Sequence, residues 1–150
     1  MKILVIGGGG REHALCWTLH RSPIVEEIFC APGNPGIAEV ADCLPVSVSD
    51  IVEIADLAAK LHVDLTVVGP ELPLSLGIAD EFIKRELPIF GPTRLAAQIE
   101  SSKVFSKEFF WRHQIPTAEA TICQSADEAR RAIKKYGFPA VLKADGLAGG

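Results

Sequence analysis

The first 21 residues constrain the fold more than any other part of the sequence. A short and mostly apolar run, residues 2–6, leads into four consecutive glycines, and residues 11–21 have the character of a helix. Apolar runs of this length are typical of strands that are buried on both faces, as in a parallel sheet. The strand, the glycine turn and the helix together predict an α/β fold.

The same alternation of strand and helix continues to about residue 100. The segment 50–61 gives the clearest helical pattern, because Asp50 is a candidate N-cap and apolar residues recur after it at helical spacing. Such an alternation predicts a Rossmann-like parallel sheet whose strand-to-helix loops share one edge. The further strands are expected at 27–30, 65–68 and 88–90, and the further helices at 75–86 and 93–99.

The character of the sequence changes near residue 100, and we place a domain boundary within 92–101. We expect residues 1–100 to form an N-terminal α/β domain and residues 101–150 to form the incomplete beginning of a second domain. In that second part Ser125 is a candidate helix N-cap. Helices are predicted at 101–113 and 125–136, and strands at 118–123 and 138–143.

Composition excludes several classes of protein. Of the 150 residues, 48% are hydrophobic, and 15 basic against 19 acidic residues give a net charge of −4. The chain is too apolar to be disordered, and no segment approaches the ~20 apolar residues of a membrane span. The N-terminal apolar run is too short for a secretion signal, and the acidic balance gives no general reason to expect nucleic-acid binding. We therefore expect a cytoplasmic protein with no membrane or nucleic-acid partner.

The cysteines and histidines give no sign of a metal site. The four cysteines are scattered, with no C-x-x-C pair and no zinc-like spacing to a histidine. We interpret them as reduced thiols that fill apolar space. The four histidines are isolated, so we expect no metal ligands within this chain.

The glycine run after the first strand predicts a phosphate site. Gly8, Gly9 and Gly10 let the backbone approach a ligand, and the helix that follows directs free N–H groups toward it. Arg11 offers a bidentate clamp for the phosphate. A dinucleotide-binding G-x-G-x-x-G pattern fits poorly, because Glu12 stands where the third glycine belongs. A tight turn without a ligand is the other alternative, although consecutive glycines are costly in conformational entropy.

Two further loops are expected at the same edge of the sheet. The loop 33–36 offers Asn34, with Pro35 and Gly36 fixing its backbone, and the loop 69–73 offers Pro70 and Glu71. Each loop alone is more typical of a plain turn. Together they combine N–H donors for a phosphate with a carboxylate for hydroxyls or an amine, which predicts a sugar-phosphate site.

Two lysines in the second part are candidates for contact with a nucleotide. Lys143 ends a predicted strand that runs directly into glycines, although the sequence contains no Walker A pattern. A lone lysine is usually a solvated surface residue. Lys103 has no neighbouring glycines, so its spacing alone does not support a contact with a nucleotide.

Seven short motifs follow one another along the chain. They are GGREHA (9–14), APGNPG (31–36), VGPE (68–71), FGP (90–92), ESSK (100–103), IPTA (115–118) and KADGLA (143–148). Taken in this order, the set resembles the glycinamide ribonucleotide synthetase family, also called the phosphoribosylamine–glycine ligases. The resemblance covers all 150 residues, and the ordered set is far more specific than any single motif.

The resemblance implies an ATP-grasp ligase that joins glycine to 5-phosphoribosylamine with ATP, through a glycyl phosphate. It also implies Mg²⁺ or Mn²⁺ to neutralise phosphate charge. Phosphoribosylamine would lie against residues 8–12, 34–36 and 70–71 of the N-terminal domain. ATP would contact Lys103, Lys143, Gly146, Gly149 and Gly150, the glycines forming the start of a loop over the phosphates.

The sequence departs from the family pattern at two places. Leu72 stands where the family usually has Ala, and Gly149 replaces an alanine of the terminal motif. The acidic metal ligands are expected beyond residue 150, so we assign no catalytic or metal-binding residue within the chain and expect no turnover from it alone. The alternatives are another ATP-grasp ligase or carboxylase with a similar N-terminal domain, or a nucleotide-binding regulator. We expect a monomer with small-molecule substrates.

Overall fold

The computed structural model describes residues 1–147. It divides into two compact units, Met1–Ala97 and Gln98–Gly150, which we describe separately as unit 1 and unit 2.

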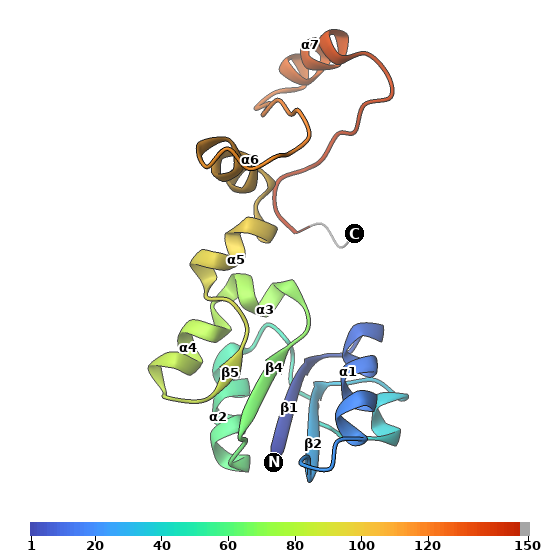
Figure 1. The fold of residues 1–150 in the computed structure, drawn as a ribbon, viewed down its shortest axis with the longest axis vertical. Helices are drawn as coiled ribbons and strands as arrows, with labels where there is room; N and C mark the ends of the chain where they lie inside the picture. The colour runs from blue at the N-terminus through green and yellow to red at the C-terminus, as the bar shows by residue number, and fades with distance from the viewer. Residues whose placement is uncertain (148–150) are drawn as a thin grey trace. The chain divides into compact units, whose positions relative to one another are not determined.

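Unit 1 is built on a five-stranded parallel sheet with the strand order β3-β2-β1-β4-β5 (Figure 1). This sheet confirms the predicted α/β class. In the central strand β1, Leu4, Val5 and Ile6 are fully buried, as expected for a strand covered on both faces. The strands are β1 (Lys2–Gly7), β2 (Glu27–Pro32), β3 (Asp42–Cys43), β4 (Leu65–Val68) and β5 (Ile89–Phe90).

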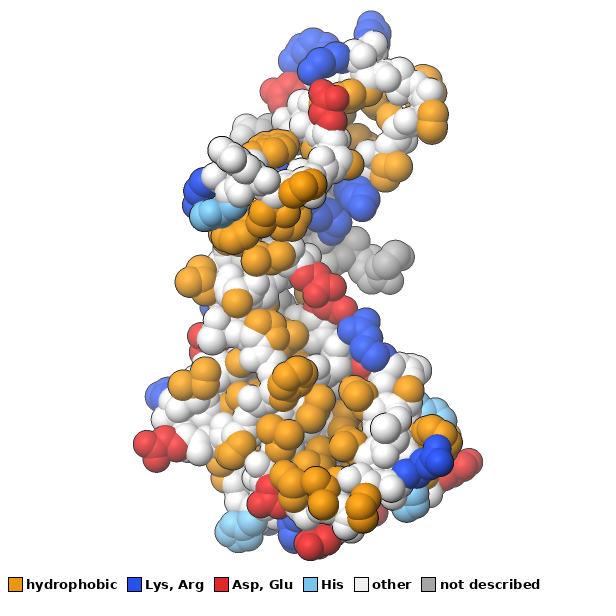
Figure 2. Space-filling view, viewed as in Figure 1, with side chains coloured by type: hydrophobic (Ala, Val, Ile, Leu, Met, Phe, Trp, Pro, Cys, Tyr) orange, Lys and Arg blue, Asp and Glu red, His pale blue; other side chains and the backbone are white. Residues whose placement is uncertain are grey.

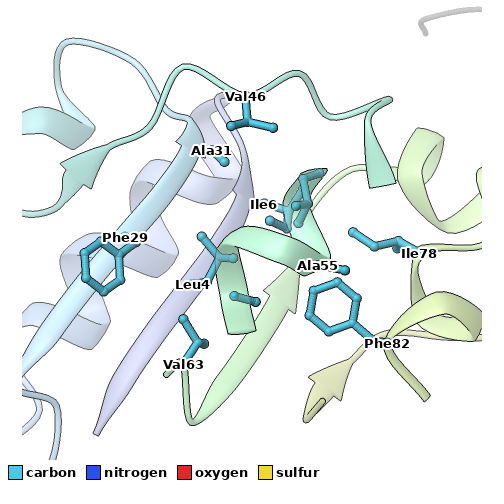
Figure 3. Close-up of a cluster of buried hydrophobic side chains, with 11 residues drawn as sticks. Leu4, Ile6, Phe29, Ala31, Val46, Ala55, Val63, Ile78 and Phe82 are labelled. Carbon is cyan, nitrogen blue, oxygen red and sulfur yellow. The ribbon is translucent and has the colours of Figure 1, made fainter. Parts of the chain in front are cut away.

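Helices cover both faces of this sheet. Alternate residues of a strand point to opposite faces, so Leu4 and Ile6 join one core while Ile3 and Val5 join the other. The first core includes Phe82 and is drawn in Figure 3. It packs against α2 (Ile51–Leu61) and α4 (Ile78–Lys84), and the second core packs against α1 (Gly10–His20) and the 3₁₀-helix η1 (Ile37–Glu39).

The predicted helix 75–86 is wrong in its extent. The chain instead forms α3 (Glu71–Leu76) and α4, which are separated at Gly77. Gly77 has φ +95°, a left-handed conformation that ends a helix and that glycine adopts without strain. The short β3 and η1 are elements that the sequence pattern did not predict.

Unit 2 contains the second half of α5 (Arg94–Ser101), then α6 (Lys103–Arg112) and α7 (Ala126–Tyr136). Ser125 caps α7 as predicted, because its hydroxyl accepts the Glu128 N–H at 3.2 Å. The strands predicted at 118–123 and 138–143 are wrong, since residues 98–147 contain no strand. The apolar side chain of Phe138 is instead 87% exposed, which is what an apolar segment shows when no neighbouring strand pairs with it.

Some apolar surface stays uncovered in unit 1. Hydrophobic side chains gather over β4 in the space-filling view (Figure 2), and Phe90 of β5 is 71% exposed. No helix within residues 1–147 is long and apolar enough to cross a membrane.

Candidate functional site

The strand order places the topological switch point of the sheet between β1 and β4. From β1 the chain runs through β2 to β3 on one side, and β4 and β5 lie on the other, so the order reverses between β1 and β4. Ligands of open parallel sheets bind where this reversal occurs. The loop after β1 and the loop after β4 therefore flank the expected binding position, as the sequence predicted.

The glycine loop comes close to the neighbouring loop through its backbone. Gly33 N–H donates to the Gly7 carbonyl at 3.1 Å, and a Cβ added at Gly8 would lie 2.5 Å from the Gly33 carbonyl oxygen. Any residue larger than glycine at position 8 would force the two loops apart. Gly9 and Gly10 are exposed and begin α1, so the first N–H groups of that helix lie at the edge of the sheet.

Asn34 fixes the second loop with both ends of its amide. Its Nδ2 donates to the Gly8 carbonyl at 2.9 Å, and its Oδ1 accepts the Ile37 N–H at 2.9 Å. The side chain therefore ties the loop after β2 to the glycine loop and starts η1 at the same time. Pro35 beside it is exposed, and Gly36 is the residue that precedes η1.

Arg11 links the glycine loop to the loop after β4. Its Nη1 donates to the Gly69 carbonyl at 2.9 Å, and Nη1 and Nη2 each lie 3.2 Å from Glu71 Oε1. The Arg11 side chain is 65% exposed and that of Glu71 is 32% exposed. Pro70 is the residue before α3 and so directs Glu71 into the first turn of that helix.

The charge state of Glu71 follows from these contacts. Its pKa is lowered first by a hydrogen bond from its own backbone N–H and then by the Arg11 guanidinium. The carboxylate is therefore ionised at neutral pH. The edge of the sheet thus presents one cation and one anion to a ligand.

Glu12, which the family resemblance places against the substrate, is buried. Its side chain is 4% exposed, and its Oε2 accepts the Gly9 N–H at 2.7 Å. The carboxylate also fills the space beside Gly69, where an added Cβ would overlap it. Glu12 thus packs against both the glycine loop and the loop after β4 from the interior of the protein. Its position three residues after Gly9 is the spacing of a capping box, a signal that the sequence already contained.

In unit 2, Asp145 caps α6, and sequence analysis did not single it out. Its Oδ1 accepts the Lys103 N–H at 2.7 Å and the Val104 N–H at 3.2 Å, and the Ser102 hydroxyl donates to both of its oxygens at 3.2 Å. The hydrogen bond from Val104 is the largest of the causes that lower the pKa of Asp145. The segment that follows Lys143 is thereby joined to the start of α6.

The predicted nucleotide-facing residues of unit 2 are partly brought together. Lys103 Nζ donates to the Gly146 carbonyl at 2.6 Å, so these two lie side by side. Lys143 is exposed, and the strand that was predicted to present it does not form within the described residues. Gly149 and Gly150 lie outside the described residues.

The cysteines are free, as the sequence analysis expected. Cys16 and Cys30 are fully buried, and Cys43 and Cys123 are partly exposed. Cys30 donates to the Gly7 carbonyl at 3.2 Å, and its hydrogen bond with Cys16 together with burial raises its pKa. A raised pKa keeps the Cys30 thiol protonated and unreactive at neutral pH.

Two models of known protein families match the chain. Residues 1–100 match the family model described as phosphoribosylglycinamide synthetase, N domain. The chain belongs to the phosphoribosylglycinamide synthetase family. Residues 101–150 match the ATP-grasp (A) domain of the same family. The resemblance that the sequence motifs indicated is thereby confirmed.

Individual relatives show the same relationship. A phosphoribosylamine–glycine ligase of Caldanaerobacter subterraneus subsp. tengcongensis is 48% identical over 150 residues, which is all of this chain and 36% of that protein. The crystal structure of a Thermotoga maritima phosphoribosylamine–glycine ligase matches with a TM-score of 0.72 and 29% identity, over 98% of this chain and 34% of that one. The chain thus spans about a third of the length of these family members.

The fold extends beyond the family. An N5-carboxyaminoimidazole synthase from Aspergillus clavatus, solved with ADP and 5-aminoimidazole ribonucleotide, has a TM-score of 0.69 at 22% identity. The match covers 92% of this chain and 36% of the synthase chain. At this identity the likeness concerns the fold alone.

Proposed function

We propose that this chain forms the phosphoribosylamine-binding part, and the beginning of the ATP-binding part, of a phosphoribosylamine–glycine ligase. The complete enzyme would join glycine to the amine of 5-phosphoribosylamine and release ADP and phosphate. Residues 1–100 would be the substrate domain and residues 101–150 the start of the ATP-grasp domain. The family to which the chain belongs supports this activity.

The observation that carries the proposal is the joining of three loops at the sheet edge. Asn34 ties the second loop to the glycine loop, and Arg11 ties the glycine loop to Glu71. The start of α1 and the Arg11 guanidinium suit a phosphate, while Glu71 and Asn34 suit hydroxyls or an amine. A sugar phosphate is the ligand class that uses both sets of groups.

Titration of ribose 5-phosphate into the chain by calorimetry tests this site. Charge-assisted hydrogen bonds contribute about 1.5–3 kcal/mol, so Arg11→Ala should weaken binding by at least ~10-fold. Arg21→Ala is the matched control, because Arg21 follows the last turn of α1 and its guanidinium lies over the Trp17 ring, 4.6 Å from the ring centroid. It removes the same charge and should leave the affinity unchanged. Equal binding by wild type and Arg11→Ala would rule out the phosphate site.

The ATP side of the proposal rests on unit 2. We propose that Lys103, Lys143, Gly146, Gly149 and Gly150 contact the phosphates of ATP, with Mg²⁺ or Mn²⁺ neutralising charge. Within residues 1–147 no group of three or more His, Cys, Asp or Glu side chains is placed to hold a metal ion. The acidic ligands of the metal are expected beyond residue 150, and no step is assigned through it. We propose a monomeric cytoplasmic enzyme.

The alternatives from the sequence differ in the acceptor and in the ligand. A carboxylase of similar fold would activate bicarbonate in place of glycine, and a nucleotide-binding regulator would bind NAD or a nucleotide without turnover. The N-domain family match favours the glycine ligase. Ligase assays of the complete enzyme with glycine or bicarbonate separate the first pair, and we expect product only with glycine. We expect no turnover from the 150-residue chain alone, and detectable product from it would contradict that expectation.

A further inference from the structure

The cation proposed to bind phosphate is already engaged by an anion. Arg11 Nη1 and Nη2 both lie 3.2 Å from Glu71 Oε1. A third hydrogen bond, from Nη1 to the Gly69 carbonyl at 2.9 Å, keeps the guanidinium over the loop that carries Glu71. A phosphate that reaches Arg11 therefore arrives beside a carboxylate.

Both partners remain accessible to a ligand. The Arg11 side chain is 65% exposed and that of Glu71 is 32% exposed, so neither charge is sealed inside the protein. An ion pair in this environment is weak, so a ligand that binds the guanidinium more strongly can displace the Glu71 carboxylate from it. Glu71 then keeps its charge and needs a hydrogen-bond donor in place of Arg11.

We propose that Glu71 is a specificity-determining residue that competes with phosphate for Arg11. A bare phosphate must separate the pair and then sit beside an unpaired carboxylate. A sugar phosphate that also brings a hydroxyl or amine supplies Glu71 with a new donor, so its binding offsets the lost contact. The site thereby selects ligands that carry both a phosphate and a donor group, an inference that rests on the proposed function.

The size of the effect follows from the exposure of the pair. Exposed ion pairs contribute up to about 1 kcal/mol, which corresponds to an about fivefold change in affinity. Removing the charge of Glu71 should therefore tighten binding of inorganic phosphate about fivefold. The effect should shrink as salt is added, because exposed charges are screened over about 10 Å at 0.1 M ionic strength.

The experiment titrates inorganic phosphate and ribose 5-phosphate separately into the wild-type chain and Glu71→Gln. The substitution keeps the shape of the side chain and removes its charge. Glu27→Gln is the matched control, since Glu27 forms an ion pair of the same 3.2 Å length with Lys2. This pair lies at the amino ends of β1 and β2, whereas the candidate site lies at the carboxyl ends of the strands. It changes the net charge equally and should alter neither affinity. Circular dichroism before each titration verifies that the variants are folded.

We expect Glu71→Gln to bind inorganic phosphate more tightly and to lose most of the preference for ribose 5-phosphate. The ratio of the two affinities should fall more than twofold and up to about fivefold. A ratio that stays within twofold of wild type would overturn the role of Glu71. So would inorganic phosphate that binds Glu71→Gln more weakly than wild type, or that binds neither protein detectably. Failure of the wild type to bind ribose 5-phosphate, or equal binding by Arg11→Ala, would instead overturn the proposed function itself.

Discussion

Replacing Glu12 by alanine measures how much the buried carboxylate stabilises the glycine loop. Glu12 is 4% exposed and accepts the Gly9 N–H at 2.7 Å, in the first turn of α1. The substitution leaves the Gly9 N–H without its acceptor and takes a negative charge away from the positive end of the helix dipole. Both effects destabilise the folded chain.

The expected loss of unfolding free energy is the sum of the hydrogen-bond and the charge–dipole contributions. A hydrogen bond to a charged group contributes about 1.5–3 kcal/mol, and a charge near a helix end contributes about 0.3–1 kcal/mol. Glu12→Ala should therefore lower the free energy of unfolding by about 2–4 kcal/mol. Glu12→Gln keeps an oxygen acceptor in the same place and loses only the charge, so its cost should be about 1–2 kcal/mol.

Urea unfolding monitored by tryptophan fluorescence provides the assay. The chain has two tryptophans, so a Trp111→Phe background leaves Trp17 on α1 as the reporter of unit 1. Glu53→Ala is the matched control, because Glu53 is also the third residue after an N-cap, in α2, but is exposed. Its cost should stay within about 0.5 kcal/mol. If Glu12→Ala costs no more than Glu53→Ala, the carboxylate does not support the loop and the reasoning fails.

Three further predictions concern the core, α7 and Asp145. Phe82→Ala should cost about 3–5 kcal/mol in the same urea assay, since Phe82 is fully buried among the helices behind the sheet; a cost below about 1 kcal/mol would contradict this packing. Hydrogen exchange should be faster in α7, which has no buried residue, than in α2, and equal protection would contradict that order. The pKa of Asp145 is lowered in the folded state, so its contacts with Lys103 N–H and Val104 N–H should persist above the ordinary carboxyl pKa and be lost as pH falls through the lowered value. Backbone amide chemical shifts of these two residues should follow that titration in wild type and not in Asp145→Asn.

Local patterns were sufficient for the elements that carry a clear apolar run or helical spacing of their own. The apolar run of β1 and the helical spacing of α2 predicted both elements, because each depends on its own periodicity. The break at Gly77 was missed, since a single glycine inside a helical pattern is compatible with either a continuous or an interrupted helix. The strands expected at 118–123 and 138–143 require neighbouring strands, and an apolar run in the sequence does not say whether a neighbour exists.

The candidate site was likewise predicted from the sequence only in part. The sequence located Gly8, Asn34 and Glu71 at one edge, because the carboxyl ends of parallel strands share that edge. It did not predict that Arg11 pairs with Glu71 or that Asp145 caps α6, since these contacts join residues 60 and 42 positions apart. Such pairings depend on the packing of whole loops, which periodicity does not describe.

The double use of the Asn34 amide has a consequence for chemical ageing. Deamidation would turn the Nδ2 donor into a carboxylate oxygen, which would face the Gly8 carbonyl that it now contacts at 2.9 Å. Spontaneous deamidation starts when the backbone nitrogen of the next residue attacks the side-chain carbonyl. Here that residue is Pro35, whose nitrogen carries no hydrogen, so the usual ring closure is blocked. The proline that shapes the loop thus also protects the amide that holds it to the glycine loop.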